Sequence, residues 1–130
     1  MLEWLPSWST GVEEIDNQHK KILVIINDIL AEINSGEDQI SLNSLLEKLA
    51  NYAREHFETE ETYLDTMGYE LFHSHQDQHN TYLDVVSDFW LSGKYRDEKY
   101  REELVEFIQN WWKTHILVED LIWARNLGTI

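Results

Sequence analysis

Residues 15–33 read IDNQHKKILVIINDILAEI, and large side chains recur in them at steps of four and three residues. The positions in this repeat are Ile15, His19, Ile22, Ile26, Ile29 and Ile33. Because an α-helix turns once every 3.6 residues, these positions all lie on one face of a helix. An aliphatic face of this kind points into a protein core. The stretch therefore predicts a buried helix face that includes one histidine, His19.

Three further stretches repeat the pattern and carry polar residues on the same inward faces. They contain Leu42, Leu45, Leu49, Tyr52, His56, Glu60, Tyr63 and Met67; Phe72, His75, His79, Tyr82, Val86 and Phe89; and Leu104, Ile108, Trp111 and His115. Together with the first stretch they predict helices over about 16–35, 41–67, 70–92 and 98–118. Strand alternation and hairpin turns are absent. We therefore predict an all-α, up-down-up-down four-helix bundle in a single domain, 1–130, with an N-terminal arm over about 1–14 and a short C-terminal segment.

Glycines and short polar residues mark the expected helix ends. Left-handed C-caps are predicted where a glycine follows a helical stretch, at Gly36, Gly68 and Gly93. N-caps are predicted where a short polar side chain precedes one, at Asp16, Ser41 and Asp97.

The composition limits the class of protein. The chain of 130 residues carries 25 Asp and Glu against 10 Lys and Arg, a formal net charge of -15. Such a charge repels phosphate backbones and anionic membrane surfaces, so we expect neither nucleic acid nor membrane as a partner. The absence of cysteine excludes disulfides, thiolate nucleophiles and cysteine-ligated metals. The N-terminus lacks the basic and apolar regions of a secretory signal, and we predict a cytoplasmic monomer.

The inward faces also carry several groups that bind metals. Five of the six histidines lie on them, together with one glutamate: His19, His56, His75, His79, His115 and Glu60. His56 and Glu60 are four residues apart, so both project from one side of their helix, and His75 and His79 do the same. A buried polar group without a partner costs about 1–3 kcal/mol, and the positions around these are mostly apolar. A shared metal centre satisfies all of these groups at once.

The number and kind of candidate ligands narrow the choice of metal. A single tetrahedral zinc takes four ligands, fewer than this set offers. Calcium and magnesium prefer oxygen ligands, whereas this set is rich in nitrogen. Imidazole with a bridging carboxylate suits iron, manganese or copper, and the size of the set suits two ions held close together. The residues by themselves leave the choice among these three metals open.

Four motifs, in order along the chain, resemble those of the hemerythrins, in particular the short single-domain bacteriohemerythrins. They are Gly11-Val12 with Ile15-Asp16-x-Gln18-His19-Lys20, then His56-Phe57-x-x-Glu60-Glu61, then His75-x-x-x-His79, and finally Trp111-x-x-x-His115-Ile116 with Asp120. The resemblance implies a non-haem centre of two iron ions joined by an oxo or hydroxo bridge. It assigns His75, His79 and His115 to one iron, His19 and His56 to the other, and Glu60 and Asp120 to both as bridges.

The resemblance further implies reversible dioxygen binding, for storage, transport or delivery rather than catalysis. The iron at His19 and His56 keeps an open coordination position for the gas. We expect the wall of the oxygen pocket to consist of apolar residues near the ligands in sequence, namely Ile22, Phe57, Trp111, Ile116 and Leu117. Three other uses stay open: oxygen or redox sensing, handling of nitric oxide or peroxide, and iron buffering. A delivery or sensing role would add an oxygen-consuming enzyme or a signalling protein as a partner.

Three acidic or histidine residues near the motifs lie off the predicted inward faces. Asp120 follows His115 by five residues, about 140° around a regular helix. It can share the site only if the helix widens into a π-type bulge or ends near residues 116–119. Glu61 points about 100° away from Glu60, and His73 lies off the face of the other histidines on its helix, so both are predicted at the surface.

Overall fold

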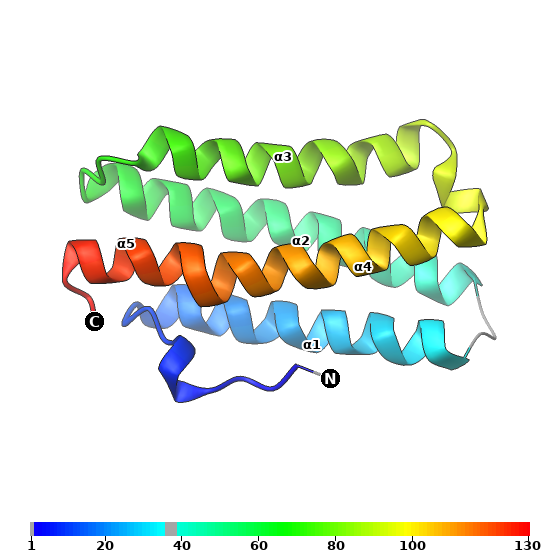
Figure 1. Ribbon diagram of the computed structural model, residues 1–130, viewed down its shortest axis with the longest axis horizontal. Coiled ribbons are helices and arrows are strands. Elements are labelled where there is room, and N and C mark those ends of the chain that lie inside the picture. Colours follow the sequence, from blue (N-terminus) through cyan, green and yellow to red (C-terminus); the bar gives the residue numbers. More distant parts are fainter. Residues whose placement is uncertain (1, 36–38) are drawn as a thin grey trace.

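The computed structural model describes residues 2–35 and 39–130, and in this part of the chain it contains helices and no strand (Figure 1). The helices are α1 (Glu13–Ser35), α2 (Gln39–Thr66), α3 (Phe72–Leu91), α4 (Glu98–Thr114) and α5 (Asp120–Leu127). A π-helical turn, His115–Glu119, joins α4 to α5, and two 3-10 turns cover Pro6–Trp8 and Lys94–Arg96. The predicted all-α fold is confirmed.

The helices form an antiparallel four-helix bundle. Each of α1, α2 and α3 contacts the helix that follows it, and α4 also contacts α1 and so closes the bundle. Short connections between successive helices make neighbours run in opposite directions. Figure 1 shows α4, the π turn and α5 as one continuous rod along the bundle. The predicted up-down-up-down arrangement is confirmed, and the predicted short C-terminal segment is the helix α5.

The core consists of two clusters of buried apolar side chains. The larger cluster fills most of the bundle, and the smaller lies where α5 packs near the start of α1 and the end of α2. On α1, His19 falls between Ile22 of the larger cluster and Ile15 of the smaller one. On α2, Glu60 falls between members of the two clusters in the same way. The polar candidate ligands therefore form a layer between two apolar regions.

Most positions of the predicted inward faces are buried, and Met67 is the exception. Its side chain is 46% exposed, because α2 ends at Thr66 and the chain turns away at Gly68. Leu64 takes the last inward position of α2 and is fully buried. Partly buried positions at the edges of the core are Ile33, Leu45, Tyr52, Tyr63, Phe72 and Trp111. The prediction of Met67 as a core residue was wrong.

Three of the predicted helix caps are confirmed. The carboxylate of Asp97 accepts a hydrogen bond from the backbone N–H of Lys99 at 2.9 Å, as an N-cap residue does. Gly68 follows α2 with a φ of 68°, and Gly93 follows α3 with a φ of 81°. Both glycines therefore adopt the left-handed conformation expected just after a helix.

Two other predicted caps are wrong, since the helices begin earlier than expected. Asp16 lies inside α1, which starts at Glu13, and Ser41 lies inside α2, which starts at Gln39. The predicted cap at Gly36 lies outside the described residues.

The N-terminal arm is fastened to the side of α1. The side chain of Asn27 accepts a hydrogen bond from the N–H of Leu2 at 2.9 Å and donates one to its carbonyl at 2.8 Å. The rings of Trp4 and Trp8 meet edge to face with centroids 6.0 Å apart. Trp4 also lies beside His19, with ring centroids 6.4 Å apart. The arm thus covers the outer side of α1 at the level of the polar layer.

The end of the arm is joined to the C-terminus of the chain. Asp16 accepts hydrogen bonds from Ser9 Oγ at 2.5 Å and from the N–H and hydroxyl of Thr10 at 2.8 Å each. The hydroxyl of Thr129 donates to the Thr10 carbonyl at 2.5 Å. Gly11 has a φ of 79°, and a Cβ there would lie 2.0 Å from the Thr129 carbonyl oxygen. Only glycine fits at this point, so it fixes the approach of the two chain ends.

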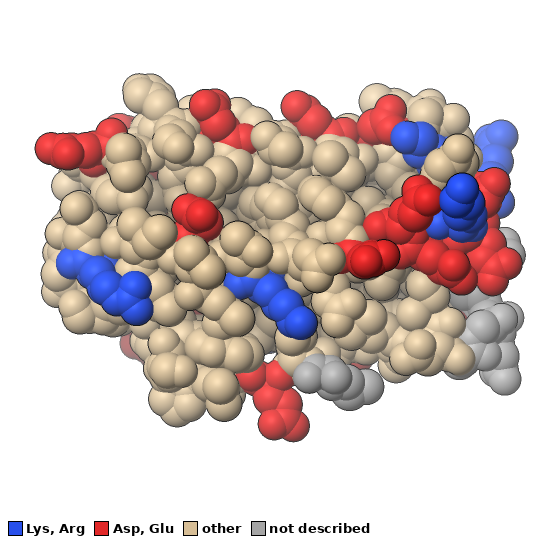
Figure 2. Space-filling model, viewed as in Figure 1, with Lys and Arg blue, Asp and Glu red and all other residues tan. Residues whose placement is uncertain are grey.

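Charged side chains are spread unevenly over the face seen in Figure 2. Acidic side chains, with some basic ones, gather at the end of the bundle where α4 begins, and the middle of that face carries few charges. Among the described residues, no helix combines the length and the apolar character that crossing a membrane requires.

Candidate metal centre

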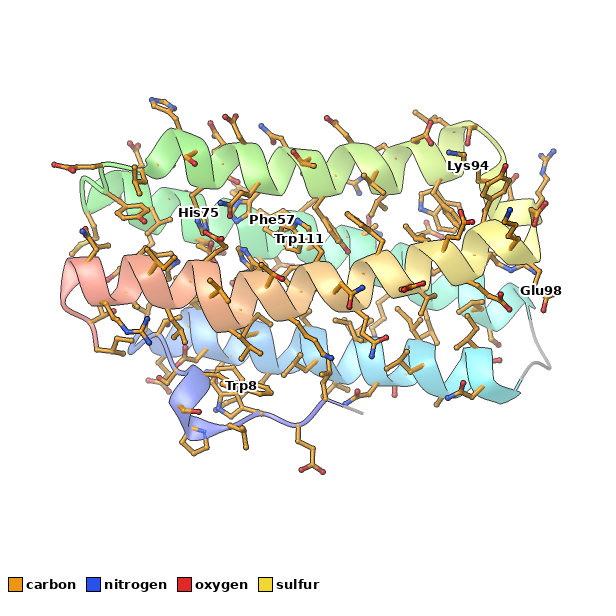
Figure 3. The ribbon with its side chains drawn as sticks, viewed as in Figure 1. Trp8, Phe57, His75, Lys94, Glu98 and Trp111 are labelled. Carbon is orange, nitrogen blue, oxygen red and sulfur yellow. The ribbon has the colours of Figure 1, made fainter. Side chains whose placement is uncertain are left out.

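The structure brings together all of the residues that the sequence analysis named as metal ligands. Each of these residues is at least 97% buried, and together they come from α1, α2, α3, the π turn and α5. They are His19 on α1, His56 and Glu60 on α2, His75 and His79 on α3, His115 on the π turn and Asp120 on α5. Figure 3 shows His75 pointing from α3 into the bundle, at the level where Phe57 and Trp111 also lie.

Glu60 lies at the centre of the cluster, with its two oxygens facing different histidines. Its Oε2 is 3.1 Å from His56 Nε2 and 3.8 Å from His19 Nε2. Its Oε1 is 3.1 Å from His79 Nε2 and 3.5 Å from His115 Nε2, and it also contacts His75 Nε2. A carboxylate placed in this way can bridge two metal ions.

Asp120 faces the same cluster from α5. Its Oδ2 is 2.8 Å from His19 Nε2 and 3.0 Å from His115 Nε2, and its Oδ1 is 3.2 Å from His75 Nε2. The indole N–H of Trp123 donates a hydrogen bond to Oδ1 at 3.0 Å and fixes the carboxylate. A second carboxylate thus lies between histidines of different helices.

The π turn explains how Asp120 reaches the cluster. The backbone N–H of Asp120 bonds to the carbonyl of His115, five residues earlier, so one wide turn separates the two. In a regular α-helix the two side chains would point about 140° apart. Of the two devices that the spacing allowed, the chain uses the π-type bulge, and the helix does not end there.

The donor atoms fall into two overlapping groups. One group consists of His19, His56, Glu60, His115 and Asp120; the other consists of Glu60, His75, His79 and His115. Within each group the donor atoms lie within 4.8 Å of one another. Two neighbouring metal positions that share Glu60 therefore fit the arrangement. His115 lies within reach of both, whereas the family resemblance gives it to one.

Several of these buried atoms have no hydrogen-bond partner in the described part of the chain. They are Nδ1 and Nε2 of His19 and His115, Nε2 of His56, Oε2 of Glu60 and Oδ2 of Asp120. Some approach an atom of opposite polarity closely, as the distances above show, but in directions that do not make a hydrogen bond. Buried polar atoms are nearly always satisfied in folded proteins. A cation that accepts the lone pairs of the Nε2 atoms and the carboxylate oxygens satisfies all of these atoms except the two Nδ1 atoms, so the donor set fits a metal centre.

Charge in the cluster is balanced by protons when no cation is bound. Burial alone would raise the pKa values of Glu60 and Asp120, but the neighbouring imidazoles hold both well below their ordinary range. Burial alone would lower the pKa of a histidine, and it does so at His56, to about 4. At His75 and His115 the two carboxylates outweigh burial and raise the pKa to about 9 and about 10.

Two polar residues of the quoted motifs, to which no contact was assigned from the sequence, contact the candidate ligands. Gln18 Oε1 lies 2.7 Å from His56 Nδ1, and Glu61 Oε2 lies 3.0 Å from His79 Nδ1. The Glu61 side chain is 21% exposed and belongs to neither donor group, so Glu61 is partly exposed and touches a candidate ligand without being one. His73 is exposed, as predicted.

The residues assigned to the pocket wall belong to the larger apolar cluster or pack against it. Ile22, Phe57 and Ile116 are buried, and Trp111 and Leu117 are partly buried against the same core. Two of them stack on candidate ligands. The Phe57 ring lies 4.0 Å from that of His79 at an interplanar angle of 11°, and the Trp111 ring lies 4.7 Å from that of His115 at 16°. The cluster therefore has an apolar and aromatic surround.

Comparison with known proteins agrees with this geometry. The family model described as the hemerythrin HHE cation binding domain matches residues 10–127. The chain belongs to the hemerythrin family. The resemblance seen in the four motifs is confirmed, and all of the candidate ligands lie inside the matched region. A hemerythrin-family domain with a buried cluster of histidine and carboxylate groups supports a metal centre at this place.

Individual hemerythrin relatives cover nearly the whole chain. It is 30% identical over 124 residues to a bacteriohemerythrin of Clostridium acetobutylicum, covering 92% of this chain and 96% of that protein. A bacteriohemerythrin of Methylococcus capsulatus is 24% identical over 129 residues, which is 98% of each chain. A solved crystal structure of a mutant protein superposes with a TM-score of 0.84 at 25% identity, covering 98% of each chain.

Proposed function

We propose that this chain binds dioxygen reversibly at a centre of two iron ions. The observation that carries the proposal is the pair of overlapping donor groups, which share Glu60 between two adjacent positions. In this proposal His75, His79 and His115 hold one iron, His19 and His56 hold the other, and Glu60 and Asp120 bridge the two. The single domain of residues 1–130 would act as a monomer in the cytoplasm, for oxygen storage, transport or delivery.

The donor chemistry favours iron over the other cations considered. Calcium and magnesium sites are built from oxygen ligands, and a single zinc site takes four ligands. Imidazole nitrogens with bridging carboxylates suit first-row redox metals such as iron, manganese and copper, and membership of the hemerythrin family selects iron among them. When bound, the iron pair supplies the electrons that dioxygen takes up and returns.

The residues around the cluster support binding rather than turnover. Ile22, Phe57 and Ile116 are buried, Trp111 and Leu117 are partly buried against the same core, and the rings of Phe57 and Trp111 stack on candidate ligands. In this proposal these five side chains form the wall of the oxygen pocket. Such a wall keeps water and loose protons away from the gas and its metal, which limits irreversible oxidation. We therefore propose a carrier and not an enzyme.

A spectroscopic experiment tests the proposal. The iron-loaded protein is reduced without air, exposed to oxygen and then flushed with inert gas, while the visible spectrum and the iron content are recorded. We expect two irons per chain and a coloured form that appears with oxygen and disappears on its removal. Direct oxidation to a ferric form that never returns, with turnover of peroxide or nitric oxide, would contradict carriage. Iron that a mild chelator removes within minutes would point to buffering instead.

A further inference from the structure

The two polar side chains that contact candidate histidines from outside the cluster, Glu61 and Gln18, differ in charge. Each candidate histidine presents Nε2 to the centre, and the opposite nitrogen, Nδ1, faces outward. At His79 the outward nitrogen meets the carboxylate of Glu61 at 3.0 Å. At His56 it meets the neutral amide of Gln18 at 2.7 Å. His79 belongs to one donor group and His56 to the other, so the two metal positions have outer contacts of unequal charge.

The contact at His79 has a defined direction. An ionised carboxylate only accepts hydrogen bonds, so Nδ1–H of His79 donates to Glu61 Oε2. The other oxygen of Glu61 accepts from the amide of Gln76 on α3 at 2.7 Å. Glu61 is thereby held in place by two residues of the facing helix.

The contact at His56 is fixed by a chain of hydrogen bonds. The hydroxyl of Thr59 donates to the carbonyl of Glu55 at 3.1 Å, so its oxygen accepts from Gln18 Nε2 at 3.1 Å. The remaining amide atom of Gln18, its oxygen, therefore accepts from Nδ1–H of His56. Both histidines keep the tautomer that leaves Nε2 free for a metal, but only one donates to a full negative charge.

We propose that Glu61 and Gln18 make the two metal positions unequal in reduction potential, with the position at His79 the more easily oxidised. The inference rests on the proposed di-iron function. A carboxylate that accepts from Nδ1–H makes the imidazole a stronger donor and stabilises the higher oxidation state of its metal, whereas a neutral amide does this far less. Glu61 and Gln18 are positioning residues that act through the histidines and do not bind the metal.

Reciprocal swaps of nearly equal size test the inference. The variants Glu61→Gln and Gln18→Glu exchange the charges, and the two one-electron reductions of the iron-loaded protein are followed by spectroelectrochemistry. We expect Glu61→Gln to change the equilibrium constant of one of the two one-electron reductions tenfold. This change raises the corresponding reduction potential by about 59 mV. Gln18→Glu should lower the other potential by a similar factor, and the double swap should change the paramagnetic resonance signal of the half-reduced protein.

A matched control separates this effect from a general change of charge. Glu58→Gln removes one negative charge from the same helix at an exposed position and should move both potentials little. A purely structural role for Glu61 would lower the unfolding temperature and leave the difference between the potentials unchanged, which would overturn the inference. Equal shifts of both potentials would overturn it as well.

Loss of iron from Glu61→Gln and failure of the wild-type protein to carry dioxygen give different results in these measurements. Should Glu61→Gln lose its iron, the potentials of Gln18→Glu decide the matter alone. The reductions are measured in nitrogen-purged solution, so wild-type protein that loads two irons but fails to carry dioxygen disproves the proposed function and still tests this inference.

Discussion

At the scale of single residues, Glu60 is the side chain on which the whole cluster depends. Both of its oxygens approach histidines, and those histidines come from α1, α2, α3 and the π turn. No other described residue lies in both donor groups except His115. Removing this carboxylate takes a donor from both metal positions at once, whereas removing His56 takes a donor from one.

We expect Glu60→Ala to lose most of its iron, and His56→Ala to lose iron or the oxygen-bound form. Iron per chain, measured by mass spectrometry of the metal, together with the visible spectrum reports both effects. His73→Ala serves as the control because His73 is exposed and lies off the site. Two irons and normal oxygen binding in Glu60→Ala would show that the assigned site is wrong.

Gly11 allows the N-terminal arm to approach the C-terminus of the chain closely. An added Cβ would meet the backbone of Thr129 at 2.0 Å, where no flexible side chain can move aside. We expect Gly11→Ala to cost about 1–3 kcal/mol beyond the strain of its positive φ. Gly68→Ala is the control, since Gly68 has a φ of 68° and nothing within 4 Å of its Cβ position. Urea unfolding of the two variants should therefore differ, and equal losses would argue against the contact.

At the scale of elements, the π turn is the feature that determines how α5 meets the cluster. It places one extra residue in the rod formed by α4 and α5, and the extra residue makes a spacing of five behave as one turn. Val118 is 48% exposed and lies within this turn. Removing it would leave Asp120 four residues after His115, which in a regular helix is the same side.

We therefore expect deletion of Val118 to keep both the helix content and the metal. Deletion of the exposed Lys113, in α4, should instead rotate the part of α4 before it by about 100° relative to His115, and so lose metal and stability. Circular dichroism and iron content measure both. Loss of metal on deletion of Val118 alone would show that the wide turn itself is required.

The elements also show which features a sequence can predict. The helices and their inward histidines follow from a repeat near 3.6 residues, so α1 to α4 and the stripe positions of His19, His56 and Glu60 were predictable. Asp120 does not follow this repeat, because it lies beyond the π turn, and only the family resemblance assigned it. Met67 was misplaced because the repeat continues past the point where α2 ends.

The contacts of Gln18 and Glu61 were not predicted, for a different physical reason. Each adjoins a stripe residue along the chain, at a position that points away from the core axis of its own helix. Their contacts are made with the outward nitrogens of histidines on neighbouring helices. Such contacts depend on how two helices pack, which a periodicity within one helix does not report.

At the scale of the whole molecule, the bundle contains a polar layer between two apolar clusters. The metal-free protein keeps that layer by holding protons between histidines and carboxylates. For His75 and His115 the raised pKa values, about 9 and about 10, mean that folding favours the protonated form. Their contribution to stability is fully present below about pH 6.5 and is lost as the pH rises through 9 to 10.

His56 and the two carboxylates act in the opposite direction. Burial lowers the pKa of His56 to about 4, so its neutral form is favoured and stability falls as the pH drops from about 6.5 toward 4. The lowered pKa values of Glu60 and Asp120 add to the loss in acid. The metal-free protein should therefore be most stable near pH 6 to 7.

Metal binding reverses the alkaline part of this profile. A bound cation needs neutral imidazoles, so at pH 7 it displaces the protons held by His75 and His115, and it binds more tightly as the pH rises. We expect the unfolding temperature of the metal-free protein to fall between pH 7 and pH 10 and that of the loaded protein to fall much less. Calorimetric titration of Zn²⁺ into the metal-free protein, in buffers of different ionisation enthalpy, should show proton release at pH 7. Binding without proton release would mean that these histidines are already neutral, and the charge balance described for the cluster would then be wrong.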